Sequence, residues 1–170
     1  LKNKKKPISC IIGGSKVSTK ISILSKLCEI ADNLIIVGAM ANNFIKYKGF
    51  EIGSSLVENH SENKIKEIYD LSKKNNCKII VPVDVKTSLE LNGTPSNKKL
   101  KNIDLKDIIL DIGEDTSKLI NQLIDSSNTV FWNGPAGYYE NKNFAEGSVL
   151  IAKKMANNTR SKSLISIVGG

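Results

Sequence analysis

Short apolar segments alternate with longer amphipathic ones along the whole chain. The apolar segments are rich in Ile and Val and lack regular polar alternation, which is typical of strands buried on both faces of a parallel sheet. Six segments are predicted to be strands: residues 8–12, 34–37, 78–81, 108–112, 129–132 and 163–168. Their alternation with helical segments predicts an α/β fold with three layers and a mostly parallel sheet of about six strands.

Apolar residues recur at helical spacing between these strands. The predicted helices are residues 21–32, 40–49, 62–75, 117–127 and 145–158. Residues 83–106 differ, because they contain Asn-Gly, Pro and a lysine pair, and they are predicted to form an exposed loop with weak hairpin structure. We find no internal repeat, and the 170 residues are interpreted as one domain.

Glycine follows five of the six predicted strands. The positions concerned are Gly13, Gly14, Gly38, Gly113, Gly134, Gly169 and Gly170. Open parallel sheets bind ligands beyond the carboxyl ends of their strands, and glycine lets the backbone approach a ligand closely. Tight turns explain any one glycine alone, but the recurrence favours a ligand site. The last glycine pair is expected to lead into a further helix, so the chain looks shortened.

Residues 13–20 read GGSKVSTK, with two lysines at the predicted start of a helix. A helix N-terminus favours anions, so cations there indicate that an anionic ligand lies in front of them. Lysines four residues apart share a helix face, and Lys16 and Lys20 are predicted to converge on one phosphate group. The alternative is two solvated surface lysines. Neither the P-loop nor the G-x-G-x-x-G fingerprint is present, which weakens a dehydrogenase interpretation.

Residues 130–140 read VFWNGPAGYYE. A strand ends in the only tryptophan and is followed by an amide, a Gly-Pro turn, two tyrosines and a carboxylate. The Asn133 side chain is able to donate to a phosphoryl oxygen, and Glu140 to accept from vicinal ribose hydroxyls. The aromatic residues form either a pocket wall or core packing beneath the loop.

The amino-acid composition argues against a membrane-spanning protein and against a nucleic-acid partner. Hydrophobic residues make up 40% of the chain and charged residues 25%, with no apolar run long enough to span a membrane. The net charge is +8, but the basic residues are scattered and only Arg160 is an arginine, so nucleic acid is not an expected partner.

The three cysteines and the single histidine give no sign of a disulfide framework or a zinc site. Cys10, Cys28 and Cys77 are widely spaced, and His60 is predicted to be a surface residue. A reducing cytoplasm fits this pattern best.

Several of these motifs together resemble the phosphoglycerate kinase family. They are GGSKVSTK, MANNFIKYKGFEIGSSLVE, VPVDV, LDIG and WNGPAGYYENKNFAEG, in the family's order and at about its spacing. The resemblance is to the carboxyl-terminal, nucleotide-binding domain of bacterial members, and it covers residues 1–170. It implies a Rossmann-like fold and a reversible phosphoryl transfer between 1,3-bisphosphoglycerate and Mg-ADP, which yields 3-phosphoglycerate and ATP in glycolysis.

The resemblance assigns roles to side chains. Lys16 and Lys20 match the two catalytic lysines that meet the nucleotide phosphates and the transferred group. Asn133 matches a phosphate-contacting asparagine, Pro135 lines the same pocket, and Glu140 matches the carboxylate on the ribose. The anion in front of the lysines would then be the phosphate chain of the nucleotide.

The resemblance also implies nucleotide contacts for loop residues at the strand ends. These are Gly13, Gly14, Ser15, Gly38, Gly113, Gly169 and Gly170. The last two match the start of the family's GGGD-T stretch, whose aspartate serves the Mg²⁺. No metal ligand is therefore expected within the chain. Departures from the family pattern are Ser15, Thr19, Glu114 and the sequence Val-Gly-Ala at 37–39, where the family has three glycines.

The family's amino-terminal domain, which binds 3-phosphoglycerate or 1,3-bisphosphoglycerate, has no counterpart in this sequence. The chain alone is therefore predicted to be inactive, although it belongs to an active and monomeric enzyme. Two alternatives stay open: a stand-alone nucleotide-binding module without catalysis, and a nucleic-acid-binding protein whose affinity falls steeply with salt.

Overall fold

Five parallel strands form the central sheet, in the order β3-β2-β1-β7-β8. The structure is a computed structural model and describes residues 5–169. The strands are β1 (Ile8–Ile12), β2 (Asn33–Ile36), β3 (Lys78–Ile80), β7 (Thr129–Asn133) and β8 (Ile165–Gly169). The predicted α/β class, the layers and the parallel pairing are confirmed, and five of the six predicted strands lie in this sheet.

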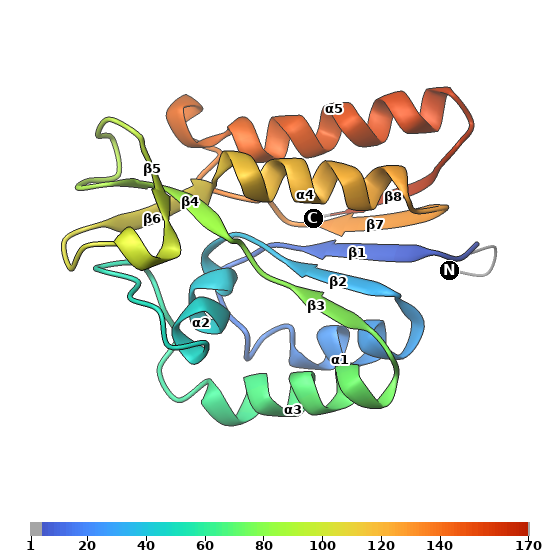
Figure 1. The fold of residues 1–170 in the computed structure, drawn as a ribbon, viewed down its shortest axis with the longest axis horizontal. Coiled ribbons are helices and arrows are strands. Elements are labelled where there is room, and N and C mark those ends of the chain that lie inside the picture. Colours follow the sequence, from blue (N-terminus) through green and yellow to red (C-terminus); the bar gives the residue numbers. More distant parts are fainter. Residues whose placement is uncertain (1–4, 170) are drawn as a thin grey trace.

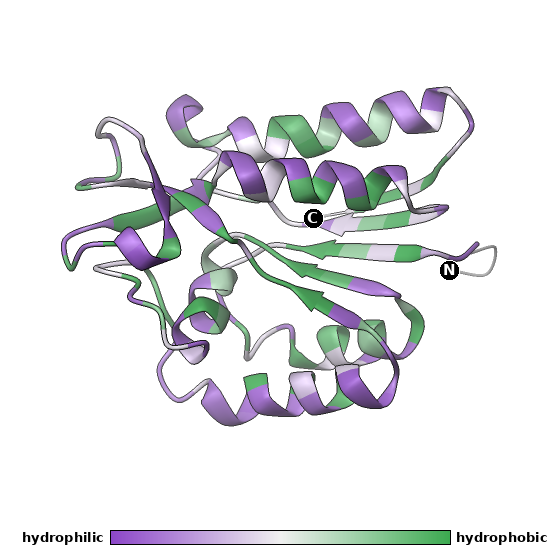
Figure 2. Cartoon of the chain, in the orientation of Figure 1, coloured by the Kyte–Doolittle hydropathy of each residue, from purple (hydrophilic) through white to green (hydrophobic). Residues whose placement is uncertain are grey.

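Helices cover both faces of the central sheet (Figure 1). They are α1 (Ile21–Ile30), α2 (Ala39–Tyr47), α3 (Glu62–Lys74), α4 (Glu114–Asp125) and α5 (Glu146–Arg160). Apolar residues of α1, α2 and α3 pack on one face, and those of α4 and α5 pack on the other. Figure 2 shows hydrophobic strands between helices whose outward faces are mostly hydrophilic. All five predicted helices are confirmed, within a few residues at their ends.

A second, antiparallel sheet lies beyond the carboxyl ends of the central strands (Figure 1). It consists of β4 (Asp84–Ser88), β5 (Ser96–Lys99) and β6 (Ile108–Ile112) in the order β5-β4-β6. Two short 3₁₀ helices complete the secondary structure: Leu100–Asn102, directly after β5, and Lys142–Phe144, before α5.

The expected place of residues 108–112 in the parallel sheet was therefore wrong. This strand pairs antiparallel with β4, because its apolar run specifies burial but not a partner. The hairpin structure expected within residues 83–106 is confirmed, because β4 and β5 pair antiparallel. The expected exposure is wrong for β4, in which four of the five residues are buried.

No helix in the described part of the chain is long and apolar enough to cross a membrane. The carboxyl ends of β1, β2 and β7 lead into three loops that face α2 and the second sheet, and these loops bring together most of the predicted site residues.

Candidate functional site

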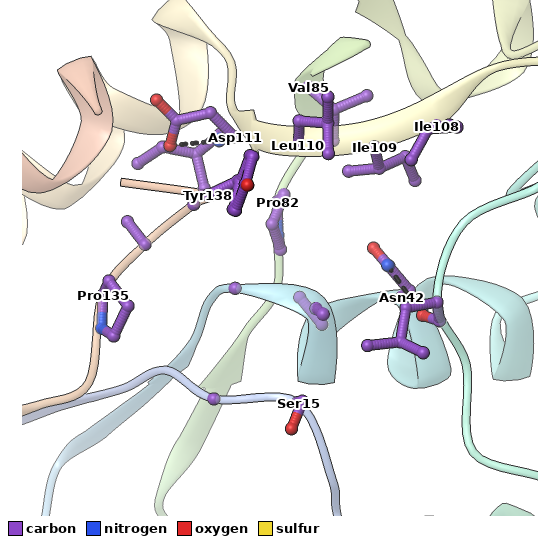
Figure 3. A pocket seen from close by; sticks show the side chains of 18 of the residues that line it. Ser15, Asn42, Pro82, Val85, Ile108, Ile109, Leu110, Asp111, Pro135 and Tyr138 are labelled. Atoms are coloured by element: carbon purple, nitrogen blue, oxygen red, sulfur yellow. Dashed lines mark hydrogen bonds between the residues drawn. The ribbon is translucent and has the colours of Figure 1, made fainter. Parts of the chain in front are cut away.

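A cavity of about 410 Å³ lies between the strand-end loops, α2 and the second sheet (Figure 3). Five of the predicted site residues line it: Gly14, Ser15, Gly38, Pro135 and Glu140. Its opposite wall is apolar and comes mainly from α2, β4 and β6, with Ile45, Val85, Ile108, Ile109 and Leu110. The cavity therefore has an apolar side and a side made of glycine-rich backbone.

The loops at the strand ends touch through their backbones, which explains several of the glycines. A Cβ atom on Gly13 would lie 2.0 Å from the Pro135 carbonyl oxygen, so no side chain fits there. Gly38 has a φ of +67° and donates its N–H to the Ala136 carbonyl oxygen at 3.0 Å. Gly134 has a φ of +82° and faces the Gly13 carbonyl group. These three glycines are required for loop packing as well as for any ligand contact.

Lys20 connects two of these loops. Its Nζ atom donates to the Gly13 carbonyl oxygen at 2.6 Å and to Asn133 Oδ1 at 2.9 Å. The same Nζ atom lies 3.2 Å from the position of a Cβ atom on Gly14, which lines the cavity. Partial burial lowers the pKa of the Lys20 ammonium group, because desolvation disfavours its charged form.

The expectation that Lys16 and Lys20 share a helix face is wrong. Helix α1 begins at Ile21 with Lys20 as its N-cap, and the residues before it form a turn. In that turn the Lys20 N–H donates to the Val17 carbonyl oxygen at 3.0 Å, and Val17 is fully buried.

A second contact also holds this turn out of the helix. The Ser18 N–H donates to Glu58 Oε2 at 2.9 Å, and hydrogen bonds from Ser18 lower the pKa of Glu58. Residues 17–20 thus form a separate turn, and α1 begins at Ile21, where its predicted range of 21–32 also begins. Lys16 is exposed, so the two lysines flank the glycine loop without a common helical surface.

Asn133 and Gly169 lie next to each other at the ends of β7 and β8, where they are paired in register. A Cβ atom on Gly169 would lie 3.6 Å from Asn133 Nδ2. Asn133 is thus placed between Lys20 on one side and the end of β8 on the other. Gly170, the remaining predicted residue of this group, lies outside the described residues.

The structure places Gly113 away from the cavity lining. It is buried, and a Cβ atom on it would lie 2.3 Å from the Asp84 carboxylate carbon. Asp84 in turn accepts hydrogen bonds from the N–H groups of Asp115 and Thr116, at 3.0 and 2.8 Å, in the first turn of α4. Gly113 makes room for this helix cap, which gives it a structural role in the fold.

Two buried polar residues of the lining, Asp111 and Asn42, were missed in the sequence. Asp111 interrupts the apolar run of β6, and this interruption was the available signal. Its carboxylate accepts N–H groups of Gly147 and Ile112, both at 2.9 Å. Burial raises the pKa of Asp111 to about 6, against the opposing effect of these hydrogen bonds. Asn42 carried no signal, because it lies within an ordinary amphipathic helix.

The described residues contain no group of three or more His, Cys, Asp or Glu side chains that could hold a metal ion. The residues present therefore do not fit a complete Mg²⁺ site. What they supply is a pair of lysines, an asparagine and close-packed glycine backbone next to an apolar cavity. This combination suits a ligand with an anionic end and a flat apolar end.

Comparison with known proteins agrees with this arrangement. A family model described as phosphoglycerate kinase matches residues 1–170. The phosphoglycerate kinase of Wolbachia sp. subsp. Drosophila simulans is 42% identical over 168 residues, which cover 98% of this chain and 42% of that protein. That of Francisella tularensis is 41% identical over 172 residues, covering 100% of this chain and 43% of that protein.

Solved structures show the same similarity. The phosphoglycerate kinase from Coxiella burnetii superposes with a TM-score of 0.93 at 35% identity, over 100% of this chain and 43% of that one. The enzyme from Pyrococcus horikoshii has a TM-score of 0.77 at 23% identity, covering 99% of this chain and 42% of that one. At this low identity the similarity supports the fold alone. The chain spans about 42% of the length of the curated relatives that it matches. Since the family model matches every residue, the chain belongs to the phosphoglycerate kinase family.

Proposed function

We propose that this chain is the nucleotide-binding part of a phosphoglycerate kinase, an enzyme that transfers a phosphoryl group reversibly between 1,3-bisphosphoglycerate and ADP. The observation that carries the proposal is the position of Lys20. Its ammonium group is held between the Gly13 carbonyl oxygen and Asn133, beside the cavity wall at Gly14. A fixed cation at the mouth of an apolar cavity is suited to a nucleotide, with its base inside and its phosphates at the lysine.

The phosphate end of the nucleotide is assigned to the glycine loop and the residues around it. Lys16 and Lys20 supply positive charge, and Asn133 supplies an amide donor. Transfer of a phosphoryl group depends mainly on positioning and on neutralising charge in the transition state, and the two lysines are the catalytic residues that we propose. Gly169 and Gly170 complete this end of the site.

The nucleoside end is assigned to the cavity itself. Gly38 and Pro135 line it with backbone, and the apolar wall of α2, β4 and β6 accepts a flat base. Glu140 is exposed at the edge of the cavity, where its carboxylate is able to accept hydrogen bonds from ribose hydroxyls. Gly113 belongs to this site only indirectly, through the helix cap that it allows.

Binding of the second substrate and of the metal ion is not assigned to these residues. We propose that binding of 3-phosphoglycerate or 1,3-bisphosphoglycerate requires the further length that the relatives have, in a monomeric cytoplasmic enzyme. The Mg²⁺ that accompanies the nucleotide is likewise not assigned to ligands among the described residues. These 170 residues alone are expected to bind nucleotide without turnover.

Calorimetric titration of the chain with ADP tests the proposal, with and without Mg²⁺ and with NADH as a control ligand. We expect ADP to bind, Lys20→Ala to weaken the binding at least tenfold, and NADH to give no heat. A folded chain that does not bind ADP, or a Lys20→Ala variant that binds it normally, would show that the site is not a nucleotide site.

A further inference from the structure

The side chain of Lys16 is not held by contacts of its own. Within residues 5–169 its ammonium group makes no hydrogen bond or ion pair, and the residue is exposed. Lys20 differs, because its Nζ atom donates to the Gly13 carbonyl oxygen and to Asn133 Oδ1. The direction in which Lys16 points is therefore set by the backbone of the turn that carries it.

One peptide group of this turn, between Val17 and Ser18, is held at both ends. Its N–H group, on Ser18, donates to Glu58 Oε2 at 2.9 Å. Its carbonyl oxygen, on Val17, accepts the Lys20 N–H at 3.0 Å, and the Val17 side chain is fully buried. Glu58 comes from outside the turn, so it fixes the plane of a peptide group directly next to Lys16.

Glu58 is itself held by helix α2. Its N–H group donates to Asn43 Oδ1 at 2.9 Å, and the same oxygen accepts the Ser61 hydroxyl at 3.2 Å. Asn43 is only 2% exposed. In addition, the Met40 N–H at the start of α2 donates to the Gly14 carbonyl oxygen at 2.7 Å. Helix α2 thus holds the glycine loop directly and the turn with the lysines through Glu58.

The charge of Glu58 does not explain its place near a phosphate site. Hydrogen bonds from Ser18 lower the pKa of Glu58, so the side chain is a carboxylate at neutral pH. A carboxylate repels phosphate and does not attract it. What Glu58 supplies to the turn is therefore an acceptor oxygen in a fixed position.

We propose that Glu58 is a positioning residue for phosphoryl transfer, which holds the turn through the Ser18 N–H so that Lys16 reaches the phosphates of the nucleotide. This inference rests on the proposed nucleotide site and adds a residue that touches no ligand. Glu58 is the last residue of the segment MANNFIKYKGFEIGSSLVE, and neither the cavity lining nor the proposed phosphate contacts give it a role.

Two variants of similar side-chain length test the proposal. Glu58→Gln removes the charge and keeps an acceptor oxygen, whereas Glu58→Met removes both. In calorimetric titration with ADP, Glu58→Met is expected to bind about fivefold or more weakly than wild type, and Glu58→Gln to stay within about twofold. Equal ADP affinities of the two variants would overturn the proposal, because the acceptor oxygen is what distinguishes them.

Two further titrations separate positioning of Lys16 from general support of the fold. Adenosine has no phosphates, so Glu58→Met is expected to change its affinity by less than about twofold. In a Lys16→Ala background, Glu58→Met should change ADP affinity by less than about twofold, because the side chain that it positions is absent. An equal loss for adenosine and ADP, or an undiminished effect without Lys16, would show that Glu58 only supports the fold.

The outcomes also distinguish this inference from the proposed function. A wild-type chain that binds ADP, together with a Glu58→Met variant that binds it equally well, would overturn the role of Glu58 alone. A folded wild-type chain that does not bind ADP would overturn the proposed function and this inference with it. Should Glu58→Met fail to fold, Glu58→Ala replaces it, because Glu58 is only half-buried and water is able to fill the space.

Discussion

Lys20 Nζ lies 2.9 Å from Asn133 Oδ1, so a side chain at the start of α1 is joined to one at the end of β7 across 113 positions of sequence. The same ammonium group also donates to the Gly13 carbonyl oxygen. Lys20 thus ties together the loops after β1 and β7. It has a role in the fold in addition to its proposed role toward phosphate, and Lys16 does not share that role because it is exposed.

Lys16→Ala and Lys20→Ala are therefore predicted to differ. Lys16→Ala should leave the free energy of unfolding within about 0.5 kcal/mol of wild type, because its side chain is solvated. Lys20→Ala should lower it by about 1–2 kcal/mol, because two hydrogen bonds from a charged group are lost.

Both variants should weaken ADP binding, and this weakening should be smaller at high salt. Urea unfolding and calorimetry on the two variants measure the difference. Equal stability of the two variants would contradict the structural role of Lys20.

Gly13→Ala is predicted to be strongly destabilising. A methyl group there would lie 2.0 Å from the Pro135 carbonyl oxygen and 2.8 Å from that of Gly134, and both neighbours are backbone. Moving the loops apart should cost about 2–4 kcal/mol and distort the cavity. Urea unfolding gives the value.

Gly49→Ala is the matched control for this clash. Gly49 has a φ of +86°, and nothing lies within 4 Å of a Cβ atom placed on it. Its cost should be limited to about 1 kcal/mol of backbone strain. If Gly49→Ala costs as much as Gly13→Ala, steric contact between the loops is not the reason for Gly13.

The sequence predicted the central layers well because hydrophobic periodicity reports burial directly. The prediction failed where a residue or strand distant in the sequence determines the structure of a segment. The Ile-rich run of β6 reads the same whether it pairs with β4 or with the central sheet, and only the hairpin at 83–106 determines the choice. The turn before α1 depends on Glu58, a residue 40 positions away from Ser18, and local pattern carries no information about it.

The meeting of the loops that carry Gly13, Gly38 and Asn133 was predictable, because the carboxyl edge of a parallel sheet brings such positions together. Asn42 and Asp111 were not, because a polar residue within an apolar segment becomes interpretable only when its contacts are known. Gly113 illustrates the opposite case. Its place at a strand end suggested a ligand contact. The structure shows instead that a side chain at this position would clash with the Asp84 carboxylate.

Glu140→Ala is predicted to weaken ADP binding several-fold through the ribose and to leave the fold intact. Its side chain is exposed, so the free energy of unfolding should change by less than about 0.5 kcal/mol. The comparison ligand is 2′,3′-dideoxy-ADP, which lacks both vicinal hydroxyls. Calorimetry should show that Glu140→Ala weakens ADP and has almost no effect on the dideoxy analogue. An equal loss for both ligands would mean that Glu140 acts through the general charge of the site and not through the ribose.

Asp111→Asn is predicted to change how stability depends on pH. The pKa of Asp111 is raised to about 6 by burial, whereas in the unfolded chain it is about 3.9. Between these values the folded chain holds a proton that the unfolded chain has released. The contribution of this carboxyl group to stability is therefore fully present below about pH 4 and is lost as the pH rises through about 6. An asparagine at this position does not titrate and has no such slope.

The measurement is the difference in the free energy of unfolding between wild type and Asp111→Asn, taken by urea unfolding at several pH values from 4 to 7. The wild type should lose about 2–3 kcal/mol relative to the variant over this range. The difference cancels the opposite slopes of other carboxylates such as Asp32 and Asp107, whose pKa values are lowered. A difference that is flat with pH would mean that the buried carboxyl group ionises as freely as it does in the unfolded chain, and that the Gly147 and Ile112 N–H groups fully offset its burial.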